Sequence, residues 1–155
     1  MTTISAKLEQ LGITLPKVTP PAANYVPYIK VGNLVYISGT LPLKDGVFQG
    51  VGKVGDNISI EDAIATARCC GFNILAHLQN ACAGDFENVT KCVKLGIFVN
   101  ATGEFTEHPK IANGVSDLMV EVFGKEIGSH ARFAVGASGL PFGVSVEVEA
   151  IFEVK

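Results

Sequence analysis

Apolar and polar residues alternate strictly along the C-terminal stretch from Val144 to Val154. One face of this stretch would carry Val144, Val146, Val148, Ala150, Phe152 and Val154, and the other Ser145, Glu147, Glu149, Ile151 and Glu153. A period of two over this length predicts a long β-strand with one face on a hydrophobic core. The segment 132–137 before it predicts a second strand, and glycines and Pro141 between the two predict a tight connection.

This pair of strands also carries the most suggestive chemistry in the chain. Arg132 lies on the first strand, and Glu147 and Glu149 project from one face of the second. A cation that binds carboxylates close to an acid that exchanges protons is the outline of a small-molecule site. The alternative is an ion pair between Arg132 and Glu147 or Glu149 that only holds the two strands together.

Three-to-four-residue spacing of apolar positions predicts the helices. A short helix is expected over residues 3–12, followed by an extended proline-rich segment over 15–23. A longer helix of about six turns is capped by Ser59 with Asp62 as the capping-box partner, and ends before Gly84. A third begins at 107–109, with proline in its first turn, and stops at Gly124.

Further strands are predicted over 31–39, 47–51 and 89–100, with a tight hairpin turn at Asp45–Gly46 before the second of them. This order predicts a single α+β domain over residues 1–155, with 1–19 as an N-terminal extension and two helices packed on one face of a mixed sheet. Val35 and Ile37 would face one side of that sheet, and Leu34 and Tyr36 the other. The uncovered face is therefore expected to meet another subunit.

Composition narrows the function. The net charge is −3, and the 12 Lys and Arg residues are scattered, which argues against nucleic acid as a partner. No apolar run is long enough for a membrane span, and no secretory signal is recognisable, so a cytoplasmic protein is expected. Histidines and cysteines lack metal-ligand spacing, so no metal site is predicted, and His77 is interpreted as a surface or hydrogen-bonded residue. The thiols are expected to be buried and reduced: Cys69, Cys70, Cys82 and Cys92.

Four motifs together resemble the Rid family (reactive intermediate deaminases), also called the YjgF or L-PSP endoribonuclease family. They are P-A-A-N-Y-V at 21–26, G-N-L-V-Y-I-S-G-T-L-P at 32–42, H-A-R-F-A-V at 130–135 and L-P-F-G-V-S-V-E-V-E-A-I at 140–151. The resemblance runs from about residue 20 to the C-terminus. It implies a chorismate-mutase-like sandwich assembled as a homotrimer, with clefts between the subunits.

The resemblance also implies an activity, the hydrolysis of enamine or imine acids such as 2-aminoacrylate to 2-oxo acids and ammonia without a metal or organic cofactor. Arg132 falls on the position that binds the substrate carboxylate, Glu147 on the catalytic acid, and Tyr25 on a cleft tyrosine with a catalytic and binding role. Gly39 and Ala134 fall on binding positions. A guanidinium fork matches a carboxylate, and Glu147 can hold the attacking water.

Two departures bear on the substrate. Many active relatives have a cysteine where this chain has Ala134, and the family's asparagine on the last helix has three candidate counterparts, Asn113, Ser116 and Asp117. His130 and Phe142 flank the arginine and are expected to reshape the pocket. Two other functions stay open: a non-catalytic binder of small carboxylic acids that would not need the glutamate, and the endoribonuclease of the older family name.

Overall fold

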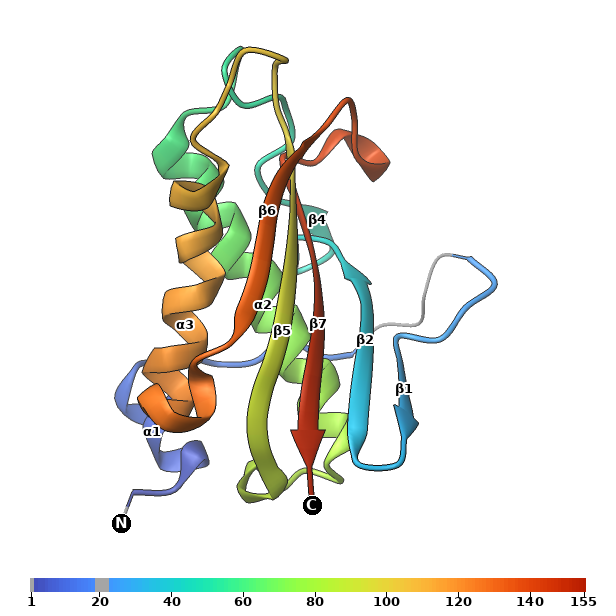
Figure 1. Cartoon of the computed structure of the whole chain (residues 1–155), viewed down its shortest axis with the longest axis vertical. Coiled ribbons are helices and arrows are strands. Elements are labelled where there is room, and N and C mark those ends of the chain that lie inside the picture. Colours follow the sequence, from blue (N-terminus) through green and yellow to red (C-terminus); the bar gives the residue numbers. More distant parts are fainter. Residues whose placement is uncertain (1, 19–22) are drawn as a thin grey trace.

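A five-stranded sheet with two long helices on one face forms the body of the molecule (Figure 1). The computed structural model describes residues 2–18 and 23–155. The strand order is β1-β2-β7-β5-β6, and every neighbouring pair is antiparallel except β5 and β6, which are parallel. The elements are α1 (Ile4–Gln10), β1 (Tyr28–Val31), β2 (Leu34–Thr40), β3 (Leu43–Lys44), β4 (Val47–Phe48), α2 (Ile60–Ala81), β5 (Val89–Asn100), α3 (His108–Gly128), β6 (Ala131–Ala137) and β7 (Val146–Val154). Short 3-10 turns lie at Phe86–Asn88 and Pro141–Gly143. The α+β prediction is confirmed.

The central strand β7 follows the alternation in its sequence. Its inward side chains, from Val146 to Val154, are at most 2% exposed, whereas the glutamates between them are half-buried on the opposite face. α2 lies across the inward face of the sheet (Figure 1). The period-two pattern therefore predicted correctly which side of β7 faces the core.

The helix boundaries follow the capping signals. The Ser59 side chain accepts a hydrogen bond from the backbone N–H of Asp62, and α2 ends at Ala81, before Gly84. In α3 the predicted stop is only partly right. Gly124 leaves helical geometry, with φ of 80°, but the helix resumes and continues to Gly128. A glycine adopts this conformation without the steric cost of a Cβ, so it breaks the helical geometry without ending the element.

Two strand predictions need correction. The predicted strand 31–39 is right over 34–39, which belong to β2, but wrong at its start, because Gly32, with φ of 60°, reverses the chain between β1 and β2. The predicted turn at Asp45–Gly46 is confirmed, with positive φ at both residues, although the returning strand ends at Phe48. Of the predicted extended segment 15–23, residues 19–22 lie outside the described part of the chain.

The larger correction concerns β6 and β7, which are not neighbours. β5 lies between them, and the connection from β6 crosses to the far side of β5 (Figure 1). Arg132 is opposite Leu95 in the parallel β5–β6 ladder, and Leu95 is fully buried on the helix side. Closeness in sequence therefore does not place Arg132 beside the glutamates of β7.

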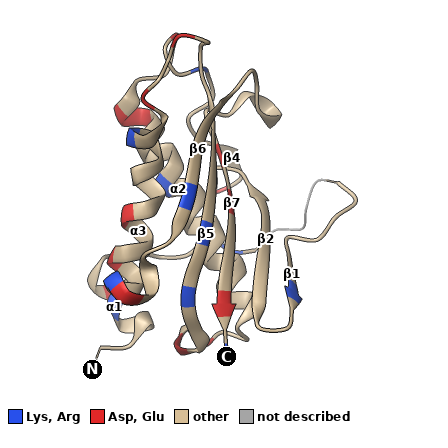
Figure 2. Ribbon diagram, viewed as in Figure 1, with Lys and Arg blue, Asp and Glu red and all other residues tan. Residues whose placement is uncertain are grey.

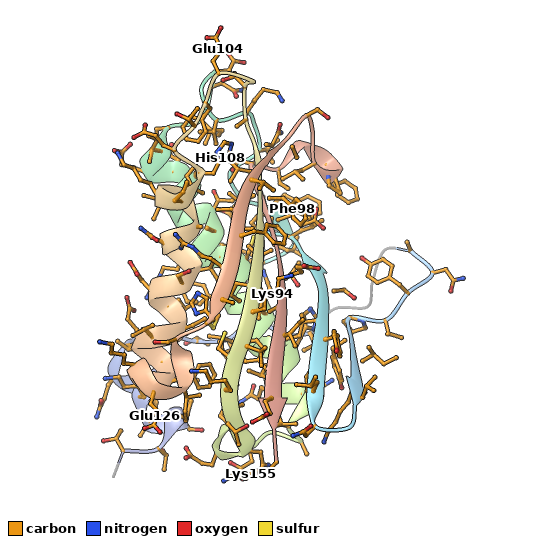
Figure 3. All side chains as sticks on the ribbon, viewed as in Figure 1. Lys94, Phe98, Glu104, His108, Glu126 and Lys155 are labelled. Atoms are coloured by element: carbon orange, nitrogen blue, oxygen red, sulfur yellow. The ribbon has the colours of Figure 1, made fainter. Side chains whose placement is uncertain are left out.

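No helix of the described residues covers the second face of the sheet. Lys94 and Phe98 of β5 project from it, away from α2 (Figure 3). Acidic and basic residues are interspersed over the ribbon rather than gathered into a stripe (Figure 2). Three of the four cysteines are buried, Cys69 is partly buried, and all four are free thiols, as expected. No helix within the described ranges is long and apolar enough to cross a membrane.

The contact between α2 and α3 depends on Gly114, because a Cβ there would collide with the backbone carbonyl of Ile64. We expect Gly114→Ala to lower the free energy of unfolding by about 1–3 kcal/mol, although alanine is otherwise preferred to glycine within a helix. Gly103→Ala is the control, since nothing lies within 4 Å of its Cβ position. Urea titrations of both variants measure the change, and a stabilised Gly114→Ala protein would contradict the prediction.

Candidate functional site

Arg132 is held by neutral groups of α3. Its Nη1 donates to Asn113 Oδ1 at 2.8 Å and to Ser116 Oγ at 2.9 Å, and Nη2 donates to the Pro109 carbonyl oxygen at 3.3 Å. No carboxylate within residues 2–18 and 23–155 forms a salt bridge with it. The alternative of an ion pair with Glu147 or Glu149 is therefore wrong for the single chain.

The hydrogen bonds of Arg132 leave one edge of the guanidinium available. Nη1 makes two of these hydrogen bonds, Nη2 one and Nε none, so the five N–H donors of the guanidinium meet three acceptors and the Nε hydrogen remains without a partner in the described chain. Two N–H groups on the same edge form the planar fork that binds a carboxylate through two parallel hydrogen bonds. Arg132 is thus oriented in advance and lacks a counterion.

A second group of predicted residues lies at the other edge of the sheet. Tyr25, just before β1, and Gly39, near the end of β2, line a cavity of about 160 Å³. Phe142 also lines it and stacks on Phe48, with ring centroids 4.7 Å apart. Tyr25 is 50% exposed, so in the isolated chain it does not close the cavity.

Glu147 packs against Gly39 from the uncovered face of the sheet and is not itself one of the residues that line the cavity. A Cβ at position 39 would collide with the Glu147 carboxylate, so only glycine lets the side chain approach β2 this closely. Burial raises the pKa of the half-buried Glu147 carboxyl, and the like charge of Glu149 raises it further. A carboxyl with a raised pKa accepts and returns a proton more readily near neutral pH.

The structure therefore joins Tyr25 and Gly39 at one cavity and places the Glu147 carboxylate against Gly39, but it does not bring Arg132 near them. β2 and β6 are separated by β7 and β5, a distance of about 14 Å at the usual spacing between strands. Arg132 also points to the helix side, whereas Glu147 points to the uncovered face. The expectation that the cation and the acids of this stretch form one site is wrong within a single chain.

Two open questions from the sequence are answered by the contacts of α3. Of the three candidate counterparts of the family asparagine, Asn113 and Ser116 bind Arg132, and no hydrogen bond joins Asp117 to it. Ala134 lies on the same side of β6 as Arg132 and packs against the core. His130 contacts Ser116, whose hydroxyl oxygen also accepts from Arg132.

His77 of α2 also lines the cavity, and the sequence interpretation missed it. Its Nδ1 is buried without a hydrogen-bond partner in the described chain, so it is neither a surface residue nor a satisfied one. Burial lowers the pKa of its imidazole, which favours the neutral form. A lone histidine in a helix gives no sequence signal of this environment, because the groups around it come from distant segments.

Comparison with known proteins identifies the family. Residues 5–152 match the model of the family described as "YjgF/chorismate_mutase-like, putative endoribonuclease". The chain belongs to this family. Some known proteins resemble this chain over nearly its whole length. Protein TCP17 of Trypanosoma cruzi is 43% identical over 98% of this chain and 94% of that protein.

Solved structures agree with the fold of this YjgF family member. A structure described as "a putative endoribonuclease" from Shewanella oneidensis has a TM-score of 0.93 and 30% identity over 98% of this chain and 99% of that one. A more distant relative has a named activity. The 3-aminoacrylate deaminase RutC of Acinetobacter baylyi is 35% identical over 50% of this chain and 56% of its own length.

The electrostatic coupling between the two glutamates gives a direct test of this half of the site. We expect Glu149→Gln to lower the pKa of Glu147, because removing a nearby negative charge favours ionisation. A carbon-detected NMR titration of the side-chain carboxyl groups measures the change. Glu153→Gln is the matched control on the same face of β7, where its carboxylate accepts a hydrogen bond from Thr90 at 2.6 Å. Equal shifts from both variants would refute the coupling.

Proposed function

We propose that this protein is a hydrolytic deaminase of small enamine or imine acids, which it converts to 2-oxo acids and ammonia. The observation that carries the proposal is Arg132, a cation oriented by three neutral acceptors with an unpaired fork and no carboxylate partner in the described chain. An arginine held in this way binds a carboxylate without first breaking an ion pair or ordering its own side chain. The named activity of RutC supports the reaction class.

The proposal includes assembly as a homotrimer. Arg132 lies on one edge strand of the sheet, whereas Tyr25 precedes the opposite edge strand β1, and Gly39 and Glu147 lie on β2 and β7. A cyclic arrangement joins one edge of each subunit to the other edge of the next, so that every interface contains both halves of a site. Exposed apolar side chains on the uncovered face, among them Tyr36 and Val135 at 41% and 43% exposure, are suited to burial between subunits.

In the proposed reaction, the enamine acid first takes a proton from solvent on its terminal carbon and becomes the iminium ion. Arg132 of one subunit binds its carboxylate, and Glu147 of the next takes a proton from a water molecule as the oxygen attacks the iminium carbon. Glu147 then returns that proton to the nitrogen, the carbon–nitrogen bond breaks, and ammonia leaves. Loss of the hydroxyl proton gives the 2-oxo acid. A protonated imine is already electrophilic, so the scheme requires no cofactor.

Tyr25 has a supporting role in this scheme. Its half-exposed ring lies at the mouth of the cavity that Gly39 also lines. Binding of a substrate there would cover the ring and exclude water from the reacting carbon, and the phenol hydroxyl would donate a hydrogen bond to the substrate.

Three variants separate catalysis from simple binding. Arg132→Ala and Arg132→Lys are both expected to lose 2-oxo acid binding, because an ammonium keeps the charge but not the fork. Glu147→Gln is expected to bind the 2-oxo acid but to lose turnover by about 10²-fold or more, since it lacks the base. Calorimetric titration and an ammonia-release assay with enzymatically generated 2-aminoacrylate measure the two properties. Unaffected turnover in Glu147→Gln would instead favour a non-catalytic role for that residue.

Mixing two inactive variants tests the shared site. If Arg132 and Glu147 act from different subunits, subunits carrying Arg132→Ala and Glu147→Gln, refolded together in equal amounts, recover about a quarter of wild-type activity in a cyclic trimer. If both residues acted within one chain, no mixture would be active. Light scattering is the control, with a mass expected near three times the 16.3 kDa of the chain. A monomer, or an inactive mixed trimer, would contradict the shared site.

A further inference from the structure

Arg132 is the first member of a short chain of hydrogen bonds that ends at the last turn of α3. Ser116 Oγ, which accepts from Arg132 at 2.9 Å, lies 2.8 Å from His130 Nε2. His130 Nδ1 in turn lies 2.7 Å from the carbonyl oxygen of Gly128. Arg132 is thus connected through a hydroxyl and an imidazole to the backbone of the helix that holds it.

The donors and acceptors of this chain fix the protonation of His130. The Gly128 carbonyl can only accept, so Nδ1 carries a hydrogen. Ser116 already accepts from the Arg132 guanidinium, which has no lone pair to offer, and its own hydroxyl hydrogen needs an acceptor. Nε2 of a neutral imidazole is that acceptor at 2.8 Å. All the hydrogen bonds are satisfied only when His130 is neutral.

A proton on Nε2 would disrupt the arrangement in two ways. Ser116 would then face two N–H donors and lose the acceptor of its own hydrogen. The imidazolium would also lie one hydroxyl away from the guanidinium, and the two positive charges would repel each other. Arg132 would then lose Ser116 as one of the three acceptors that orient its guanidinium.

We propose that His130, acting through Ser116, is a positioning residue that holds Arg132 in its ligand-binding orientation only while the imidazole is neutral. This inference rests on the function proposed above for Arg132. Histidine is the side chain whose charge ordinarily changes between about pH 5 and pH 8. Carboxylate binding is therefore expected to weaken as the pH falls through that range.

Other charged groups lie on the elements around His130. They include Asp117, Lys125 and Glu126 on α3, Arg132 on β6, Lys94 on β5, opposite Ala131 in the ladder, and Lys91 on β5, which donates to the Glu126 carbonyl oxygen at 2.6 Å. No hydrogen bond or ion pair joins any of them directly to His130 within the described residues, and Lys94 instead lies over the ring of Phe133, 5.3 Å from its centroid. Ser116 is thus the only side chain that connects His130 to the site in the described chain.

Three variants keep or break the hydrogen bond between Ser116 and His130. His130→Gln places an amide oxygen near the position of Nε2 and cannot become charged in this range. His130→Leu and Ser116→Ala each break the chain of hydrogen bonds. His108→Gln is the matched control, because His108 also lies beside β6, close to Gly136, but outside this chain.

The first readout needs no ligand. The NMR signal of the Arg132 Nε–H group, assigned by its absence in Arg132→Lys, reports the mobility of the guanidinium. We expect it to be rigid at pH 7.5 and mobile at pH 5.5 in the wild type and in His108→Gln. It should be rigid at both values in His130→Gln and mobile at both in His130→Leu and Ser116→Ala. Wild-type rigidity that does not change with pH would overturn the proposal.

The second readout is the affinity for pyruvate, which stays ionised throughout this range. We expect the wild type to bind more weakly at pH 5.5 than at pH 7.5, and His130→Gln to lose this dependence. The Glu147→Gln background removes the titration of that carboxyl. Pyruvate binding that is independent of pH, or stronger at low pH, would refute the positioning role while leaving the carboxylate site intact. Absence of pyruvate binding with the expected mobility changes would refute the carboxylate site and leave the positioning role.

Discussion

The structure depends on burial of one face of β7. This strand pairs with β2 on one side and β5 on the other, and its inward side chains are almost completely excluded from solvent beneath the helices. A shift of its register by one residue would exchange Val148 and Phe152 for glutamates on the core side, at a large cost in free energy. The register of β7 also decides which side chains of β2 and β5 point into the core, because both strands pair with β7. Val35 of β2 and Leu95 of β5 lie in the core for this reason.

The same constraint divides the charged residues between two faces. Glu147 and Glu149 must point away from the core because the residues between them point into it. Arg132 is on the helix side because β6 runs parallel to β5 with Arg132 opposite the buried Leu95. An arginine there would be costly without hydrogen-bond partners, and α3 supplies neutral ones. Arg132 therefore donates hydrogen bonds to α3, but no carboxylate of the described chain neutralises its charge.

α3 is the platform for this half of the site. Asn113 and Ser116, one turn apart, face β6 together, and the carbonyl of Pro109 and the His130 ring lie at either end of the same seam. A rigid helix holds such donors and acceptors more accurately than a loop does. The other half, around Gly39, is built differently, from close packing of a carboxylate against a glycine backbone. Each half is preorganised by its own local structure.

The sequence by itself determined the elements and the orientation of β7, because apolar periodicity, caps and turn residues act over short stretches of chain. It predicted β5, the cap at Ser59 and the buried face of β7 correctly, and the family motifs singled out Tyr25, Gly39, Arg132 and Glu147. Only the tertiary structure decided that β5 separates β6 from β7, and that Arg132 and Glu147 lie on different faces. It also chose Asn113 and Ser116 over Asp117 and left His77 unpaired. Strand order and side-chain partners depend on contacts between distant segments, and local sequence patterns carry no information about those contacts.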